Sequence, residues 1–155
     1  MMKTLLAILL AALALPAAAA DGAAVYGQRC VACHQAGGVG APGLAPPLAG
    51  QLAPRLATEE GRAYFPRVLV SGLSGPIKVG EERFMGVMPS FAQLDDEELA
   101  AVLNTVMGEY NAAGLPAGHR PYEAADIAAA RAEKLAPHQV LALRKKVLAA
   151  LGGKP

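Results

Sequence analysis

Residues 30–34 read Cys30-Val31-Ala32-Cys33-His34, and this stretch determines how the rest of the sequence is interpreted. Two thiols three residues apart lie on one turn of a helix, with an imidazole directly after them. Three uses compete for such a string: covalent attachment of haem through two thioethers, a thiol redox pair, or half of a zinc site.

The surrounding sequence favours haem. A thioredoxin-like redox pair begins a helix within a strand–helix–strand unit, and no such pattern flanks Cys30. Zinc would need two further ligands, but His119 and His138 lie far along the chain without ligand-like spacing, so we expect both at the surface. We therefore predict that Cys30 and Cys33 each bind a vinyl group of one haem and that His34 is an axial ligand of its iron.

The second axial position has three methionine candidates, Met85, Met88 and Met107. A thioether there would favour reduced iron, raise the potential and block small molecules. Met107 falls on an amphipathic helix, which favours a packing role. Met85 and Met88 flank Gly86 in a loop, where the backbone could approach a flat ring closely.

The N-terminus has the layout of a secretory signal: Lys3, an apolar run from Leu5 to Leu15, and alanines up to Ala20. We predict cleavage before Asp21, export to the periplasm, and no stable membrane insertion afterwards, because the run is too short to span a bilayer. Removing 20 of the 155 residues leaves 135, enough for one domain.

Charge divides the mature chain into two parts. Residues 21–118 hold six Lys or Arg and ten Asp or Glu, whereas residues 119–155 hold seven and three. An acidic body with a basic tail speaks against a nucleic-acid-binding protein and is compatible with electrostatic docking to another protein. With only two cysteines, a disulfide framework is excluded. We predict a haem domain over 21–118 and a C-terminal extension over 119–155.

Local patterns predict an all-α fold with one small hairpin. Thr58 can cap a helix that ends at Gly72 or Gly75, and Pro66 predicts a kink or break within it. Asp95 and Glu98 form a capping-box-like start to the strongest helix. The remaining expectations are a helix over 22–33, an ordered loop over 37–54, a hairpin of 77–79 with 83–84, and tail helices over about 123–133 and 137–150.

These residues together resemble class I cytochromes c of the bacterial periplasmic type. The resemblance covers about residues 22–110 and is carried by three segments in the family's order and spacing: Cys30 to His34, Pro46-Pro47-Leu48-Ala49-Gly50, and Gly86-Val87-Met88-Pro89-Ser90-Phe91 before a terminal helix. The implied fold is a set of helices around one covalent haem c.

The resemblance also implies roles for single residues. The methionine before proline is the family's distal ligand, which selects Met88 and leaves Met85 to pack by the haem edge. Pro46 would offer its carbonyl to the His34 ring, with Leu48 packing on the haem. Gly22 and Tyr26 resemble the residues of the first helix that cross the last one, although Thr105 stands where that helix usually supplies an aromatic residue. Arg62, Tyr64 and Arg67 are candidate donors to the haem propionates.

The function implied is single-electron transfer between periplasmic redox proteins, not catalysis. An alternative is an obligate cytochrome subunit of a periplasmic dehydrogenase, with the tail helices as its docking surface. A third hypothesis is a haem enzyme or gas sensor whose iron loses Met88 and binds peroxide or a gas.

Overall fold

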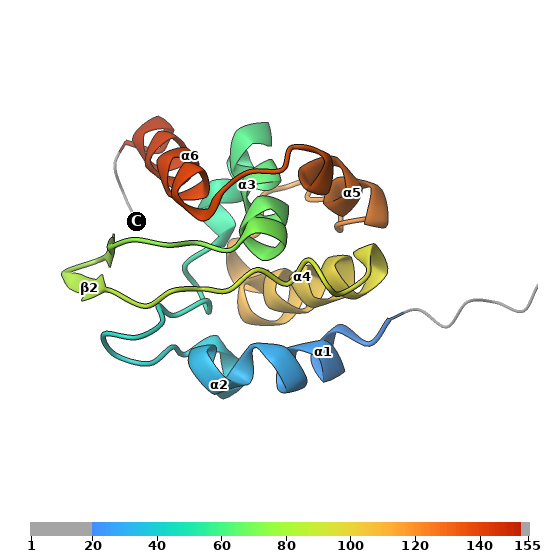
Figure 1. The fold of residues 1–155 in the computed structure, drawn as a ribbon, viewed down its shortest axis with the longest axis horizontal. Helices are drawn as coiled ribbons and strands as arrows, with labels where there is room; N and C mark the ends of the chain where they lie inside the picture. The colour runs from blue at the N-terminus through green and yellow to red at the C-terminus, as the bar shows by residue number, and fades with distance from the viewer. Residues whose placement is uncertain (1–19, 153–155) are drawn as a thin grey trace, which may run out of the picture.

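The computed structural model describes residues 20–152, so the predicted signal segment lies almost wholly outside the described residues. Within this range the chain is predominantly helical, with one two-stranded antiparallel hairpin (Figure 1). The elements are α1 (Gly22–Arg29), α2 (Val31–His34), α3 (Glu59–Ser71), β1 (Ile77–Val79), β2 (Glu82–Phe84), α4 (Asp96–Tyr110), α5 (Ala124–Ala132) and α6 (Pro137–Ala150), with short 3-10 turns at Ala36–Gly38, Ala53–Ala57 and Ala112–Gly114.

The first and fourth helices cross in close contact. Gly22 has no side chain, and a Cβ there would overlap the carbonyl of Ala101 and the hydroxyl of Thr105. One helical turn further on, Tyr26 packs edge-on against Tyr110, with ring centroids 5.2 Å apart. The aromatic partner that Thr105 cannot provide therefore comes from Tyr110, at the end of α4.

The predicted helix over 22–33 is divided at Cys30, where φ is −113°. The helical hydrogen bonds continue on both sides of it: the Cys30 N–H donates to Tyr26, and the His34 N–H donates to the Cys30 carbonyl, both at 2.9 Å. Cys30 therefore ends α1 through its N–H and begins α2 through its carbonyl.

The helix capped by Thr58 runs without a break from Glu59 to Ser71, through Pro66. The predicted break is therefore wrong, whereas the predicted kink stays a prediction. Proline cannot donate to the carbonyl four residues earlier, which belongs to Arg62. That carbonyl instead accepts a 2.9 Å hydrogen bond from the hydroxyl of Tyr122, so a residue of the C-terminal extension supplies the missing donor.

The other predicted elements are confirmed. The hairpin pairs Ile77 with Phe84 and Val79 with Glu82. Asp95 and Glu98 form a reciprocal capping box at the start of α4. Gly72 ends α3, and α5 and α6 begin and end close to the predicted limits.

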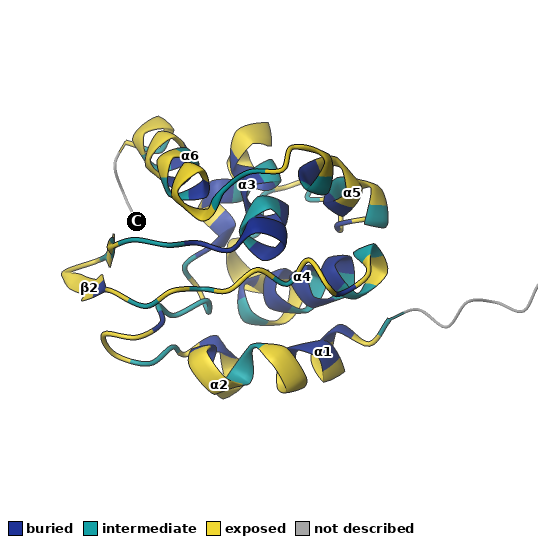
Figure 2. Cartoon of the chain, viewed as in Figure 1, coloured by how far each residue is buried: buried dark blue, intermediate teal, exposed yellow. Residues whose placement is uncertain are grey.

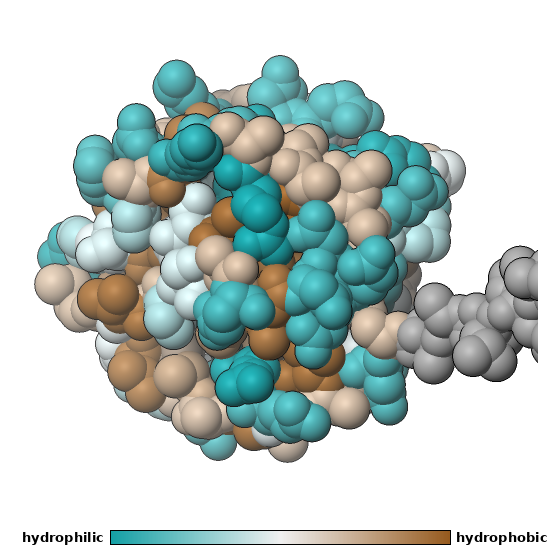
Figure 3. Space-filling view, turned by 45° about the vertical axis from the view of Figure 1, so that its right-hand side comes forward, coloured by the Kyte–Doolittle hydropathy of each residue, from teal (hydrophilic) through white to brown (hydrophobic). Residues whose placement is uncertain are grey.

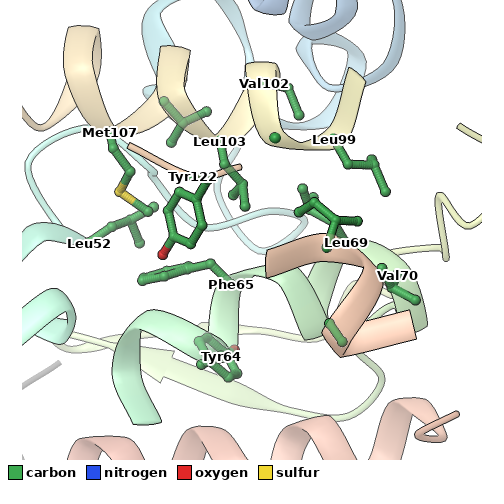
Figure 4. Packing of buried hydrophobic residues seen from close by; sticks show 14 of the residues in the cluster. Leu52, Tyr64, Phe65, Leu69, Val70, Leu99, Val102, Leu103, Met107 and Tyr122 are labelled. Carbon is green, nitrogen blue, oxygen red and sulfur yellow. The ribbon is translucent and has the colours of Figure 1, made fainter. Parts of the chain in front are cut away.

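The C-terminal extension lies across the rest of the protein: α5 packs on α3 and α4, and α6 packs on α3. Figure 2 shows the buried residues of these helices on the sides that face one another. Ile127 and Val140 are fully buried in the same core cluster as Leu99 and Met107. Figure 4 shows part of this core, where Tyr122 lies between side chains of α3 and α4.

Three ion pairs fix the extension at its edges. Arg62 and Arg67 of α3 pair with Asp126 and Glu133 of the extension, at 2.8 and 2.7 Å. Arg131 of α5 pairs with Asp96 at 2.7 Å and also donates to the carbonyls of Ala92 and Leu94. Only the Arg131–Asp96 pair joins a base of the basic tail to an acid of the acidic body; the other two pairs use the minority charges of each part, so the opposite net charges do not explain them.

Candidate haem site

A predominantly apolar cavity opens beside the Cys-x-x-Cys-His string. It contains about 1380 Å³ of space, counting its open mouth. Its walls come from most of the fold: the α1–α2 junction, the loop before residue 50, α3, the hairpin, the Met88 loop, α4 and α6. The residues individually predicted to bind or contact the haem that line it are Cys30, Cys33, His34, Pro46, Leu48, Tyr64 and Met88.

His34 is held in a single orientation on one side of the cavity. Its ring Nδ1–H donates to the Pro46 carbonyl at 3.0 Å, the contact expected from the resemblance. The loop that carries Pro46 is fixed in turn, because the Gly40 N–H donates to the His34 carbonyl and the Leu48 N–H donates to the Gly38 carbonyl. With Nδ1 protonated, Nε2 carries the lone pair that a metal requires.

Burial lowers the pKa of His34, and the hydrogen bond to Pro46 only partly opposes this effect. The neutral ring, which is the ligating form, is therefore favoured at neutral pH. Burial and the neighbouring Cys33 raise the pKa of Cys30 to about 11. Thiol redox pairs work with a lowered thiol pKa, so the environment of Cys30 does not fit that alternative.

The Met88 loop is attached to the end of α3 by main-chain bonds. Met88 and Leu73 exchange two N–H to carbonyl hydrogen bonds, of 2.9 and 3.0 Å. The Ser90 hydroxyl donates to the Val70 carbonyl at 2.6 Å, and the Phe91 N–H donates to Leu69. These bonds hold the half-buried Met88 side chain at the cavity wall.

The other two methionines lie elsewhere. Met107 is fully buried in the core cluster, as its helical spacing predicts. Met85 is 67% exposed and is not among the residues that line the cavity, so the structure does not show the expected packing by the haem edge. We expected Gly86 to let the backbone approach a flat ring. The structure shows it in close contact with the Leu44 carbonyl, which a Cβ at residue 86 would overlap. This contact brings the loops of residues 44 and 86 together at the cavity.

Of the three predicted propionate donors, only Tyr64 lines the cavity. Arg62 donates to the carbonyls of Arg120 and Pro121 and to Asp126, and its guanidinium lies over the Tyr122 ring. Arg67 pairs with Glu133. Both arginines are thus bound to the C-terminal extension. Two others, Arg55 and Arg144, line the cavity and are buried.

Sequence reasoning missed these two. A signal for Arg144 existed: Val140, Arg144 and Val147 lie at helical spacing on one face of α6, and the two valines are core residues. An arginine within an apolar stripe is a candidate for a buried partner. Arg55 follows Pro54 in a turn-rich segment and carried no comparable signal.

Comparison with known proteins agrees with this geometry. Residues 19–107 match the cytochrome c family. The chain belongs to this family. Two proteins called cytochrome c-552 from Thermus thermophilus are similar to this cytochrome: one is 51% identical over 148 residues, covering 95% of this chain and 98% of its own length. The other is 51% identical over 128 residues, covering 83% and 97%.

Membership of the family means that this cytochrome carries one covalently bound haem c and acts as an electron carrier rather than an enzyme. The residues of the cavity fit that group, because two thiols, an imidazole and apolar walls meet in one space. Arg55, which lines this cavity, also has a buried Nε without a hydrogen-bond partner. Across residues 20–152, none of the helices has the length and apolarity to cross a membrane.

Proposed function

We propose that this cytochrome passes single electrons between exported redox proteins, with His34 and Met88 as the two axial ligands of its haem. The observation that supports the ligand pair is that two segments more than 50 residues apart in sequence bring both side chains to one cavity. Each side chain is held by hydrogen bonds of its segment: the His34 ring donates to the Pro46 carbonyl, and the Met88 main chain exchanges two bonds with Leu73.

When bound, haem c supplies an iron that cycles between ferrous and ferric states. The protein residues supply rigidity and shielding around it. His34 and Met88 come from separately anchored segments, so neither ligand needs to move when the charge changes. The core side chains of α3 and α4 that line the cavity, among them Phe65, Leu69 and Leu103, exclude water from one side of it.

Exposed apolar side chains beside the cavity support transient docking of a redox partner. Leu44 and Val87 line the cavity and are 50% and 68% exposed, and Met85 stands close to Val87 in the chain. The face in Figure 3 carries small hydrophobic patches separated by hydrophilic residues. Small patches of this kind suit the brief, small contacts of electron-transfer encounters, under about 1,200 Å².

The alternative, a dehydrogenase subunit that docks through its tail helices, gains no support from the arrangement of the extension. Ile127, Val140 and Val147 are buried within this chain. The apolar faces of α5 and α6 are therefore used inside the protein, and within the described residues no separate apolar docking surface is left on them to require a partner.

Methionine substitutions test the ligand assignment. Met88→Ala in the haem-loaded protein is expected to abolish the far-red methionine-to-iron charge-transfer band and to lower the reduction potential, because the thioether favours ferrous iron. Met85→Ala is the matched control, since that side chain is exposed, and it should retain the band. Loss of the band in Met85→Ala with its retention in Met88→Ala would overturn the assignment.

Export is tested separately by the intact mass of the protein from a periplasmic fraction. We expect a chain that begins at Asp21 and carries the added mass of one haem. A cytoplasmic chain that retains residues 1–20 would contradict the proposed location.

A further inference from the structure

Arg144 occupies an unusual place on the C-terminal helix. It lies between Val140 and Val147 on the buried face of α6, where an aliphatic side chain would pack against α3. Arg144 is only 7% exposed and lines the haem cavity. Its guanidinium donates to the Lys78 carbonyl in β1 at 3.2 Å, and Leu141, one turn earlier, packs against Gly75. These two contacts pack α6 against β1 and the loop before it, at one edge of the cavity.

Arg55 lines the same cavity from a distant part of the sequence. It is 4% exposed, and one of its nitrogens donates to the Gln51 carbonyl at 3.2 Å. Its Nε is buried and has no hydrogen-bond partner. Neither Arg55 nor Arg144 forms an ion pair with the described residues, and none of the described residues lining the cavity is an aspartate or glutamate.

Two buried guanidinium groups without a carboxylate are strongly unfavourable. Burial lowers the pKa of both arginines, and the nearby Arg144 lowers that of Arg55 further. Tyr64, buried beside them at the cavity wall, can donate a hydrogen bond but cannot neutralise their charge. The cluster therefore needs an anion that enters the cavity from outside the chain.

We propose that Arg55, Arg144 and Tyr64 bind the propionate carboxylates of the haem, and that the C-terminal extension is thereby part of the haem site. A haem carries two carboxylates and the cluster offers two guanidinium groups, each able to form charge-assisted, forked hydrogen bonds. Arg144 brings one of these groups from residues beyond the region that matches the family. This inference builds on the proposed electron-transfer role, because it names residues that set the reduction potential of that site.

The test compares Arg144→Gln with Lys145→Gln in the haem-loaded protein. Lys145 is the next residue of α6 and is exposed, so the two variants lose the same charge from the same helix. Because buried positive charge disfavours the ferric state, Arg144→Gln should lower the reduction potential by clearly more than Lys145→Gln. Arg144→Lys should recover part of the difference. Equal shifts in the two glutamine variants would overturn the proposal.

A second measurement uses the unmodified protein, in case Arg144→Gln fails to assemble. NMR of the ferrous, haem-loaded protein should show nuclear Overhauser effects from the propionate methylenes to the side chains of Arg144 and Tyr64. Their absence would overturn the proposal whatever the variants do. The far-red band reports on Met88 and not on these contacts, so a wrong axial ligand and a wrong propionate site give different results.

Discussion

The hydroxyl of Tyr122 donates a 2.9 Å hydrogen bond to the carbonyl of Arg62, the carbonyl that Pro66 deprives of its partner within α3. The donor and the acceptor lie 60 residues apart in the chain. An irregularity in the middle helix is thus corrected by the extension, which ties the stability of α3 to the presence of the segment after residue 118.

Removing this donor should destabilise the protein. Tyr122→Phe keeps the ring, which packs in the core, but leaves a buried carbonyl without a partner, at a cost of about 1–3 kcal/mol in the free energy of unfolding. In a Pro66→Ala background the residue 66 N–H can bond to Arg62, so the same change should cost less. Guanidinium unfolding of the four proteins of this cycle measures the difference; equal costs in both backgrounds would refute the coupling.

The crossing of α1 and α4 should be intolerant of a single methyl group at Gly22. Gly22→Ala places a Cβ against the Ala101 carbonyl and should lower the free energy of unfolding by about 1–3 kcal/mol. Gly27 offers a matched control in the same helix, because a Cβ there meets nothing within 4 Å. Gly27→Ala should be neutral or stabilise by about 0.5–1 kcal/mol through backbone entropy. Thermal unfolding of the two variants would show whether this contrast holds.

Protonation of Asp126 at acid pH should weaken the attachment of the C-terminal extension to α3. Burial alone would raise the pKa of this carboxyl, but the Glu123 N–H and the guanidinium groups of Arg120 and Arg62 outweigh it and hold the pKa below the usual value. A group with a lowered pKa in the folded state stabilises the protein above its unfolded pKa, about 3.9, and this contribution is lost as the pH falls through the folded value.

Asp126→Asn should therefore be less stable than the parent protein at pH 7, with a smaller loss of stability below about pH 4. Glu109→Gln is the control: Glu109 is exposed near the end of α4, and the variant should keep the acid dependence of the parent. The free energy of unfolding of the parent protein and of both variants, measured across this pH range, tests the role of Asp126. An equally steep decline in Asp126→Asn would show that another group is responsible.

Local sequence signals predict much of this fold. The capping box of Asp95 and Glu98, the Thr58 cap and the glycine after α3 each act within a few residues, and each was predictable. The Cys-x-x-Cys-His motif indicated the cysteine pair and His34, and the resemblance to class I cytochromes c indicated the Pro46 carbonyl.

The contacts that were not predicted join distant parts of the chain. Nothing near Arg62 or Arg67 indicates that each binds a carboxylate of the extension, and nothing near Pro66 indicates a donor at Tyr122. Arg55 and Arg144 meet only because α6 folds back over the cavity. Sequence patterns describe the period of a helix, whereas these pairings depend on how helices pack in three dimensions.

The three ion pairs of the extension also set its register. Asp126 and Glu133 are attracted to arginines of α3, whereas Arg131, between them in the chain, is attracted to Asp96 at the start of α4. A helix whose charges all had one sign could slide by a turn and keep much of its attraction. In the extension, the charges of Asp126, Arg131 and Glu133 alternate in sign, and α3 and the start of α4 offer them partners of opposite charge. A shifted alignment would therefore lose these ion pairs rather than replace them with others. The three pairs therefore favour one alignment of the extension on the rest of the protein.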